Sequence, residues 1–529
     1  MLAVIQKSGN HLFKTCEAVT DRFFGAELNP FYQLGALAFF FFWVVAGSGL
    51  YLYAFFETSI TAAYSSVEYL TNEQWYLGGV MRSLHRYASD AMVLVAVLHL
   101  LREFCRDRFN GVRWFSWVSG VFLLWLIYAS GIGGYWLVWD QLAQFIAIRT
   151  AEWLDWLPIF NEAMARNFLN EAHVSDRLFS LLSFLHIGIP LVLLLAMWIH
   201  IQRISQAKSN PASGLGWRVL FAMLVLSFIK PAVSMAPANL DKVATQLDLD
   251  WFYLSIYPLL DLWSPALLWL LLSGGSFLLL LLPFVHRSKA TVLAEVELEN
   301  CNGCERCFID CPYSAVVMQS RTDGLPYEQE AKVNEALCVG CGICVASCPT
   351  ATPFRRKGAH VAGIELSNYS VSELRERVMR TTEALNGDAK VILFSCHHGT
   401  EINTLQKSDV AVLSLPCIGF LPPSFIDFII SRNYADGVML SGCHSGNCFH
   451  RFGIDWMEER LANQRDPGLR KRVPRERVAT CWSGAGQTKQ LEKELLAFHA
   501  RLISLGPYGG RKTYGINSDN NQTETGSEV

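Results

Sequence analysis

Residues 82–102 read RSLHRYASDAMVLVAVLHLLR, and residues 186–200 read HIGIPLVLLLAMWIH. Each stretch carries two histidines 14 residues apart, His85 and His99 in the first and His186 and His200 in the second. On an α-helix, 14 residues turn through about 1400°, close to four full turns, and rise about 21 Å. Both histidines of a pair therefore share one helix face, with one near each side of a hydrocarbon core.

Two helices with the same histidine spacing can hold two stacked haems, each iron bound by one imidazole from each helix. A single histidine in a membrane helix can instead serve as a hydrogen-bonding partner of a neighbouring helix. Ionisable groups in a membrane span are costly, however, and four of them with matched spacing favour ligation. Both helices are predicted to run in the same direction, which pairs His85 with His186 and His99 with His200.

Glycines and arginines accompany these histidines. Glycine recurs at the same 14-residue interval on two further predicted helices, at Gly35, Gly49, Gly120 and Gly134. A glycine lets a flat macrocycle lie against the helix backbone, although small residues also serve ordinary helix packing. Arg82 and Arg102 lie one turn from His85 and His99, where a guanidinium can pair with a haem propionate; for Arg102 the alternative is a charge that only sets membrane orientation.

The composition favours a membrane protein. Of the 529 residues, 51% are hydrophobic and only 17% are charged, and the net charge of −3 gives no indication of nucleic-acid binding. Segments long and apolar enough to cross a bilayer, which takes about 20 residues, lie near 31–55, 79–101, 114–138, 178–201, 217–235 and 262–285.

The charges in the loops predict the orientation. Basic residues on one side are Arg102, Arg106, Arg108, Arg113, Arg203, Lys208, Arg218, Arg287 and Lys289. Acidic residues on the other side are Glu57, Glu68, Glu73, Asp241, Asp248 and Asp250. Because basic loops stay in the cytoplasm, we expect a multi-pass protein of the inner (cytoplasmic) membrane with both termini in the cytoplasm.

Residues 29–285 resemble cytochrome b of the quinol-oxidising bc-type complexes. The matching residues are Asn29-Pro30-Phe31-Tyr32, the four glycines, Arg82-x-x-His85, His99-x-x-Arg102 and Gly134-Tyr135-x-Leu-x-Trp139. The resemblance implies two b haems, because Gln33 stands where some relatives attach a further haem through a cysteine.

The same resemblance implies an outward quinol site. Leu249-Asp250-Trp251-Phe252-Tyr253 stands where the family usually has Pro-Glu-Trp-Tyr. Asp250 and Tyr253 are therefore the candidate catalytic residues of a quinol site, with Asp250 in place of the glutamate that accepts a quinol proton. Asp140 replaces the usual glycine after Trp139.

The cysteines lie mostly in the last part of the chain. Of 15 cysteines, 13 follow residue 300, which indicates metal sites in a reducing compartment rather than a disulfide framework. Two runs, each closed by proline, are Cys301-x-x-Cys304-x-x-Cys307-x-x-x-Cys311-Pro312 and Cys338-x-x-Cys341-x-x-Cys344-x-x-x-Cys348-Pro349. This spacing predicts two [4Fe–4S] clusters, with the fourth cysteine of each run ligating the other cluster. A structural zinc module is the alternative; the pattern resembles a bacterial two-cluster ferredoxin.

Three strand-like runs further on each end in a cysteine. They are Val391–Cys396, Val410–Cys417 and Gly437–Cys443, and Cys448 follows shortly after. Carboxyl ends of parallel strands gather along one sheet edge, so Cys396, Cys417, Cys443 and Cys448 are expected to converge as ligands of a [2Fe–2S] cluster. The alternatives are buried apolar cysteines and a site in which Cys481 replaces one of the four.

Gly442-Cys443-His444-x-Gly446-x-Cys448 and Leu415-Pro416-Cys417 resemble the delta subunit that links methyl-viologen-reducing hydrogenase to heterodisulfide reductase. The resemblance implies electron exchange with a flavoprotein. Nearby histidines that either tune the cluster or are simply exposed are His397, His398, His444 and His450.

The predicted fold is multi-domain: an N-terminal cytoplasmic segment (1–30), a six-helix transmembrane di-haem bundle (31–290), a ferredoxin-like α+β module (291–360), an α/β parallel-sheet iron–sulfur domain (361–506) and a disordered tail (507–529).

The expected function is a membrane-bound electron-transfer subunit of a quinone-linked oxidoreductase, which carries electrons between the quinone pool and a cytoplasmic flavoprotein. The alternatives are a bc-like quinol oxidase subunit working with a Rieske protein, and a membrane anchor for a heterodisulfide-reductase-like or hydrogenase-like complex. Expected partners are membrane lipid, quinone, the flavoprotein or a heterodisulfide-reductase-like subunit, and a second copy of the chain in a homodimer.

Overall fold

The computed structural model describes residues 2–158, 175–202, 207–242, 247, 249–250, 253–285, 292–354, 361–444, 446–484 and 487–508. Parts of the sequence analysis fall outside these ranges, namely Arg203, Asp248, Trp251, Phe252, Arg287, Lys289 and the predicted tail from residue 509 onward. The chain forms two compact units, Met1–Thr291 and Val292–Val529.

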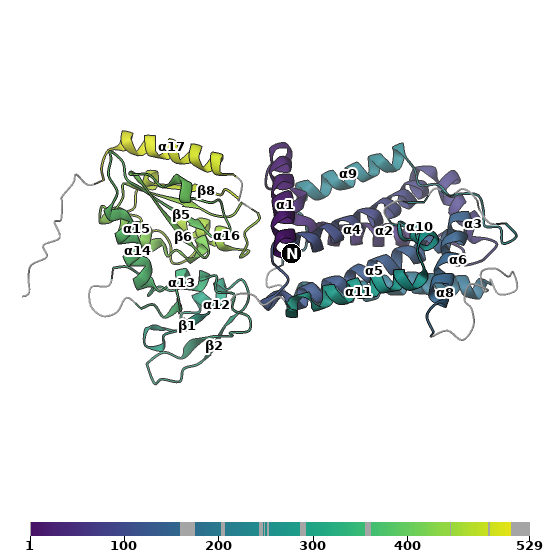
Figure 1. Ribbon diagram of the computed structural model, residues 1–529, viewed down its shortest axis with the longest axis horizontal. Coiled ribbons are helices and arrows are strands. Elements are labelled where there is room, and N and C mark those ends of the chain that lie inside the picture. The colour runs from purple at the N-terminus through teal and green to yellow at the C-terminus, as the bar shows by residue number, and fades with distance from the viewer. Residues whose placement is uncertain are drawn as a thin grey trace, which may run out of the picture. The chain divides into compact units, whose positions relative to one another are not determined.

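The first unit consists of helices (Figure 1). They are α1 (Leu2–Phe24), α2 (Leu34–Tyr53), α3 (Ala63–Glu68), α4 (Val80–Cys105), α5 (Trp114–Val138), α6 (Gln141–Asp155), α8 (Asp176–Gln202), α9 (Ser213–Ile229), α10 (Ile256–Leu262) and α11 (Pro265–Val285). Within this unit α2 packs against α4, and α5 packs against α8.

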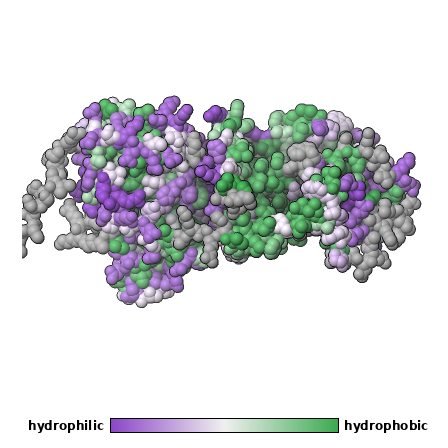
Figure 2. Space-filling view, in the orientation of Figure 1, coloured by the Kyte–Doolittle hydropathy of each residue, from purple (hydrophilic) through white to green (hydrophobic). Residues whose placement is uncertain are grey.

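Each predicted membrane span corresponds to a helix. Four helical segments of the described chain are long and apolar enough to cross a membrane: Pro30–Tyr53, Gly111–Val138, Asp176–Gln202 and Pro265–Val285. The two remaining predicted spans are α9, an apolar helix of 17 residues, and α4. The 26 residues of α4 include the charged residues Arg82, Arg86, Asp90 and Arg102. On the face drawn in Figure 2, the middle part of this unit is covered largely by apolar side chains, as expected of helices that contact lipid.

The N-terminal segment is a helix, which the sequence analysis did not predict. In Figure 1, α1 runs across the direction of α2 and α4. Its inner face buries Glu17, whose carboxylate accepts from Arg102 at 2.8 Å and from Arg106 at 2.7 Å. Its outer face exposes Val4, Ile5, Leu12, Val19, Phe23 and Phe24. The helix therefore joins the bundle through charge and leaves an apolar face open.

The first part of the second unit contains an internal repeat. Strand β1 (Ala294–Val296) pairs antiparallel with β4 (Ile364–Leu366), and β2 (Val316–Ser320) pairs with β3 (Gln329–Val333). Two one-turn helices, α12 (Arg306–Asp310) and α13 (Ile343–Ser347), each begin after a residue of positive φ, Glu305 at 61° and Gly342 at 73°. Since β4 lies beyond the predicted boundary at 360, the ferredoxin-like fold extends a few residues further than its cysteine pattern.

The second part is the predicted parallel sheet. Its strands are β5 (Val391–Cys396), β6 (Val410–Leu415), β7 (Gly437–Ser441) and β8 (Val478–Cys481), in the order β6-β5-β7-β8. Helices α14 (Val371–Glu383), α15 (Pro423–Ser431), α16 (Gly453–Leu461) and α17 (Thr488–Leu505) accompany it (Figure 1). The alternation of β5 places Ile392, Phe394 and Cys396 in one core and Val391 and Leu393 in another.

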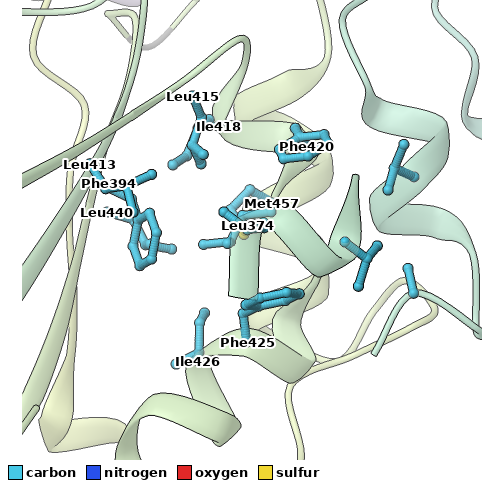
Figure 3. Close-up of a cluster of buried hydrophobic side chains, with 14 of the residues drawn as sticks. Leu374, Phe394, Leu413, Leu415, Ile418, Phe420, Phe425, Ile426, Leu440 and Met457 are labelled. Carbon is cyan, nitrogen blue, oxygen red and sulfur yellow. The ribbon is translucent and has the colours of Figure 1, made fainter. Parts of the chain in front are cut away.

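One core joins both parts of this unit. Figure 3 shows its side chains Leu374, Phe394, Leu413, Leu415, Ile418, Phe420, Phe425, Ile426, Leu440 and Met457. The same cluster includes Cys307, Cys311 and Cys344 from the ferredoxin-like part, and Cys396 and Cys443 from the sheet part. Because full burial of a large apolar side chain stabilises by roughly 1.5–3 kcal/mol, this shared core holds the cysteine-bearing segments in one compact body.

Candidate functional site

The first pair of histidines meets in the helical unit. His85 on α4 and His186 on α8 have ring centroids 6.3 Å apart. Each imidazole lies against a glycine of the neighbouring helix. A Cβ on Gly49 would lie 3.0 Å from Cε1 of His85, and one on Gly134 would lie 2.8 Å from Cε1 of His186. Two side-chain-free helix positions therefore flank this imidazole pair.

The second pair repeats the arrangement 14 residues further along each helix. A Cβ on Gly35 would lie 3.4 Å from Cε1 of His99, and one on Gly120 would lie 3.7 Å from Cε1 of His200. The predicted interval of the glycines thus matches that of the histidines, and each glycine faces one histidine. The imidazoles and the bare helix backbone beside them suit a flat macrocycle whose metal the imidazoles would bind.

Hydrogen bonds orient three of the four imidazoles. Nδ1 of His85 lies 3.0 Å from the carbonyl oxygen of Val45, and Nδ1 of His186 lies 2.9 Å from that of Ser130. Nδ1 of His200 lies 2.8 Å from the Ser119 hydroxyl. A carbonyl partner requires that Nδ1 carry the proton, which leaves Nε2 free to bind a metal.

The arginines near the histidines have carboxylate partners within the chain. Arg82 donates to Glu68 at 3.3 Å and to the Ser234 hydroxyl at 2.7 Å. Arg102 donates to Glu17 at 2.8 Å. The sequence analysis considered haem propionates for both arginines, with a charge that sets orientation as the alternative for Arg102, and it did not identify these carboxylates. Glu17 and Glu68 lie on other elements, 85 and 14 residues away from their arginines.

The predicted quinol-site residues lie beside the N-terminal half of α4, which carries Arg86. The Asp250 carboxylate pairs with Arg86 at 2.5 Å and accepts from the Tyr135 hydroxyl at 3.2 Å. Tyr253 is buried, and its hydroxyl donates to the carbonyl oxygen of Ile127 at 2.8 Å. The structure therefore brings Asp250 together with Tyr135, whereas the Tyr253 hydroxyl points into the helix bundle.

A further acid belongs to this group. Arg86 also pairs with Asp90 at 3.1 Å, and Oδ1 of Asp90 has no hydrogen-bond partner among the described residues. The sequence analysis did not single out either residue. Their signal was present as an i,i+4 pair of opposite charges in an otherwise apolar helix.

Asp140 has a structural task at the position where the resembling family has glycine. Its Oδ1 accepts from the backbone N–H of Ala143 at 2.8 Å and caps α6. Its Oδ2 accepts from the backbone N–H of Met235 at 2.9 Å. The side chain thus accepts from a buried and a partly buried backbone N–H group, and it connects α6 with a segment that is remote in the sequence.

The first ferredoxin-like cysteine group comprises the residues assigned to cluster one. Burial raises the pKa of Cys307 to about 12, and the neighbouring thiols of Cys348, Cys304 and Cys301 add to the rise. The fourth cysteine of the second run therefore lies beside the first run, as the crossed ligation pattern requires. Cys304 is exposed, so this group reaches the surface of the unit.

The second group surrounds a cavity. Its lining includes the four cysteines assigned to cluster two, Cys311, Cys338, Cys341 and Cys344. Backbone N–H groups of Ala315 and Ala294 donate to the sulfurs of Cys311 (3.2 Å) and Cys338 (3.5 Å). Burial raises the pKa of Cys341 and Cys344 well above the ordinary value, so thiolates there require a cation, as an iron cluster provides.

The C-terminal cysteines also converge. Sγ of Cys396 and Sγ of Cys443 are 3.5 Å apart. A Cβ on Gly453 would lie 2.3 Å from Sγ of Cys417 and 3.4 Å from Sγ of Cys448. Cys448 is within hydrogen-bonding reach of both Cys417 and Cys443. Four thiols from three loops thus meet at one edge of the sheet, which suits a [2Fe–2S] cluster.

Cys481 does not join this group. It ends β8 and packs in the core on the other side of the sheet, with Leu393, Met439, Leu491 and Leu495. Among the nearby histidines, His397 and His398 are exposed and His444 is half-buried. His450 is buried, and its Nδ1 lies 3.2 Å from the Tyr313 hydroxyl of the ferredoxin-like part.

Three family models match parts of the chain. The family model "Cytochrome b/b6/petB" matches residues 19–208, a "4Fe-4S dicluster domain" matches residues 300–352, and "Methyl-viologen-reducing hydrogenase, delta subunit" matches residues 391–506. These matches imply haem and iron–sulfur clusters, and an electron-transfer role for the chain.

Cytochrome b6 proteins are among the relatives. That of Heliobacterium mobile is 34% identical over 166 residues, which span 31% of this chain and 78% of the relative. That of Desmonostoc sp. (strain PCC 7906) is 35% identical over 129 residues, which span 24% of this chain and 60% of the relative. A solved structure titled "Hyperthermophilic respiratory Complex III" matches with a TM-score of 0.40 and 21% identity, over 49% of this chain and 76% of that one. The helical unit with its histidine–glycine pairs thus belongs to the cytochrome b/b6 family, and the chain extends it with a 4Fe-4S dicluster domain and a hydrogenase delta-subunit domain.

Proposed function

We propose that the chain carries electrons between the quinone pool and a cytoplasmic flavoprotein. In this proposal His85 and His186 hold one b haem, and His99 and His200 hold the other. The observation that carries the proposal is the two-level arrangement of imidazoles, each facing a glycine of the neighbouring helix. The hydrogen-bonded Nδ1 atoms of His85 and His186 support ligation through Nε2.

The thiol groups of the second unit supply the remaining sites. One [4Fe–4S] cluster is assigned to Cys301, Cys304, Cys307 and Cys348, the other to Cys311, Cys338, Cys341 and Cys344, and a [2Fe–2S] cluster to Cys396, Cys417, Cys443 and Cys448. Bound at these positions, the haems and clusters supply carriers of single electrons. Quinol differs from these carriers, since its oxidation to quinone releases two electrons and two protons.

The loop charges support the direction in which these sites face. Basic residues such as Arg106 and Arg108 follow α4, whereas Glu57 and Glu73 lie on the opposite loops. With basic loops in the cytoplasm, the second unit follows α11 on the cytoplasmic side. A flavoprotein partner is inferred from the match to the hydrogenase delta subunit, and this inference rests on analogy between families.

Potentiometric titration of the purified full-length chain tests the proposal. Optical spectra count b haems and electron paramagnetic resonance (EPR) spectra count clusters; we expect two haems, two [4Fe–4S] clusters and one [2Fe–2S] cluster per chain. Anaerobic mixing with a reduced quinol analogue is then expected to reduce haems and clusters in turn. A chain whose haems reduce while its clusters never do would instead be a membrane anchor, and a chain without b-type absorbance would refute the proposal.

A second candidate is quinol oxidation at the outward face together with a separate Rieske protein. The contact of Asp250 with Tyr135 and Arg86 favours it, because an acid and a hydroxyl meet where the resembling family oxidises quinol. Asp250→Asn is expected to slow quinol-linked haem reduction roughly 100-fold, the scale of a lost general base. Asp261→Asn is the matched control, since Asp261 also pairs with an arginine, Arg149 at 2.5 Å. Equal rates for both variants would exclude this candidate.

A further inference from the structure

A buried arginine lies where the two cysteine-bearing parts of the second unit meet. Arg460 on α16 is fully buried, with 0% of its side chain exposed. Its guanidinium pairs with the carboxylate of Asp310 and donates to the hydroxyl of Ser347 at 2.8 Å. A third, longer bond reaches the carbonyl oxygen of Gly419 at 3.4 Å. Burying a charge this completely is costly and requires partners of the kind seen here.

The partners of Arg460 all lie next to predicted cluster ligands. Asp310 precedes Cys311, Ser347 precedes Cys348, and Gly419 follows Cys417 by two residues. Ser347 also donates to Asp310 at 2.7 Å, which closes the network. One guanidinium thus fixes a ligand segment from each of the three predicted clusters.

The helix that carries Arg460 also touches the C-terminal thiols. A Cβ on Gly453, the first residue of α16, would lie 2.3 Å from Sγ of Cys417. On its other side the Arg460 guanidinium pairs with Asp310, whose neighbour Cys311 belongs to the second ferredoxin-like group. The cation therefore lies between segments of both groups.

The same junction is closely packed on its other sides. Cys341 and Cys417 share a buried cluster with Ile343, Phe452 and Trp456. A Cβ on Gly342 would lie 2.4 Å from the ring of Phe420. The indole of Trp456 donates to the backbone carbonyl oxygen of Asp310 at 3.1 Å. The two thiol groups therefore approach each other across buried, largely apolar side chains.

We propose that Arg460 is the positioning residue of an electron-passing contact between the second ferredoxin-like cluster and the C-terminal cluster, and that its fixed charge raises the reduction potential of both. This inference rests on the proposed function, because it takes both thiol groups as cluster sites. The step is the transfer of one electron: one centre is oxidised, the other is reduced, and no proton or leaving group moves. A guanidinium keeps its charge throughout, and a nearby buried cation favours the more negative, reduced state of a cluster.

Redox titration of the full-length chain, followed by EPR, tests the inference with three variants. Arg460→Gln is expected to move the midpoint potentials of both centres downward, because a cation is lost while the Asp310 carboxylate stays, paired with Arg465 at 2.5 Å. Asp310→Asn is expected to move them upward, because an anion is lost. Arg460→Lys is expected to recover most of the Arg460→Gln shift, since it retains the charge but loses part of the hydrogen-bonding fork.

Arg472→Gln is the matched control, because Arg472 also pairs with a buried carboxylate, Asp427 at 2.6 Å. Its midpoint potentials are expected to stay at the wild-type values. Iron per chain is measured for every variant, so that loss of a cluster is not mistaken for a shift. If Arg460→Gln loses iron, the result for Asp310→Asn becomes decisive. Midpoint potentials that are unchanged or lower in Asp310→Asn would then overturn the inference.

The readout separates this inference from the proposed function. Mediators and a chemical reductant set the potential in the titration, so no quinol is needed. A wild-type chain with clusters that quinol cannot reduce would refute the electron path but leave the effect of Arg460 measurable. Potentials that are the same in Arg460→Gln, Asp310→Asn and Arg472→Gln would refute the role of Arg460 alone. A wild-type chain without clusters would overturn both.

Discussion

The helical unit and the second unit bring their predicted ligands together by different means. The histidines of the helical unit stand on α4 and α8, and the period of a single helix sets the distance between the two on each. The thiols of the C-terminal group come from the ends of β5 and β6 and from the loop after β7, and only the order of the strands brings them together. In the helical unit, each predicted ligand therefore needs enough space beside it on the neighbouring helix. In the C-terminal group, the thiols must instead lie on the same side of the sheet.

The largest expected effect tests how much space the predicted haem sites of the helical unit need. Gly134→Ala places a methyl group 2.8 Å from Cε1 of His186, closer than a carbon atom can approach. We expect loss of most of one of the two haems, measured as haem per chain by optical difference spectra. The loss is expected to decrease in the order Gly134, Gly49, Gly35 and Gly120 as the Cβ distances increase from 2.8 to 3.7 Å.

Gly274→Ala is the control for this series. Gly274 lies on α11, and a Cβ there would meet nothing within 4 Å. Its haem content is expected to equal that of the unaltered chain. Full haem content in Gly134→Ala would mean that the glycines serve helix packing alone and that the proposed haem positions are wrong.

The next effect tests whether the C-terminal thiols must lie on the same side of the sheet to bind a cluster. Cys443→Ala removes a thiol that lies 3.5 Å from Cys396, and we expect loss of the C-terminal cluster with its EPR signal. Cys481→Ala removes a thiol of the core on the other side of the sheet, and we expect the signal to remain. The iron content and the EPR spectra of the two variants show which thiol the C-terminal cluster needs. A lost signal in Cys481→Ala with a retained signal in Cys443→Ala would reverse the ligand assignment.

The sequence predicted what depends on local pattern. The interval between His85 and His99 and the cysteines at the ends of β5 and β6 are short-range features, because helix period and strand alternation act over a few residues. Contacts between remote segments left no such signal. Arg102 meets Glu17 across 85 residues, and Arg460 meets Asp310 across 150. Neither buried ion pair could therefore be predicted from the sequence alone.

These two ion pairs extend the comparison, because each unit buries one arginine–carboxylate network next to predicted ligands. Glu17→Gln leaves Arg102 and Arg106 without the carboxylate that accepts from both. Breaking a buried pair from one side costs about 3–5 kcal/mol, and we expect a loss of stability near the lower end. Thermal unfolding of the detergent-solubilised chain measures it, with Glu27→Gln as the control because Glu27 is exposed. Equal stability of the two variants would mean that α1 is held by its backbone and apolar contacts instead.

The smallest expected effect concerns Asp140, where this chain departs from the glycine of the resembling family. If the departure is structural, Asp140→Asn should lose less stability than Asp140→Ala, because its amide oxygen still caps α6 through Ala143, although its NH2 group cannot accept from Met235. Asp140→Ala should lose about 1 kcal/mol from the cap, and somewhat more because Met235 also loses its acceptor. Neither variant should change haem content or the rate of quinol-linked haem reduction. A slower rate in Asp140→Asn at unchanged stability would contradict this interpretation, because charge is what that substitution removes, and it would place a second acid beside Asp250 in the outward chemistry.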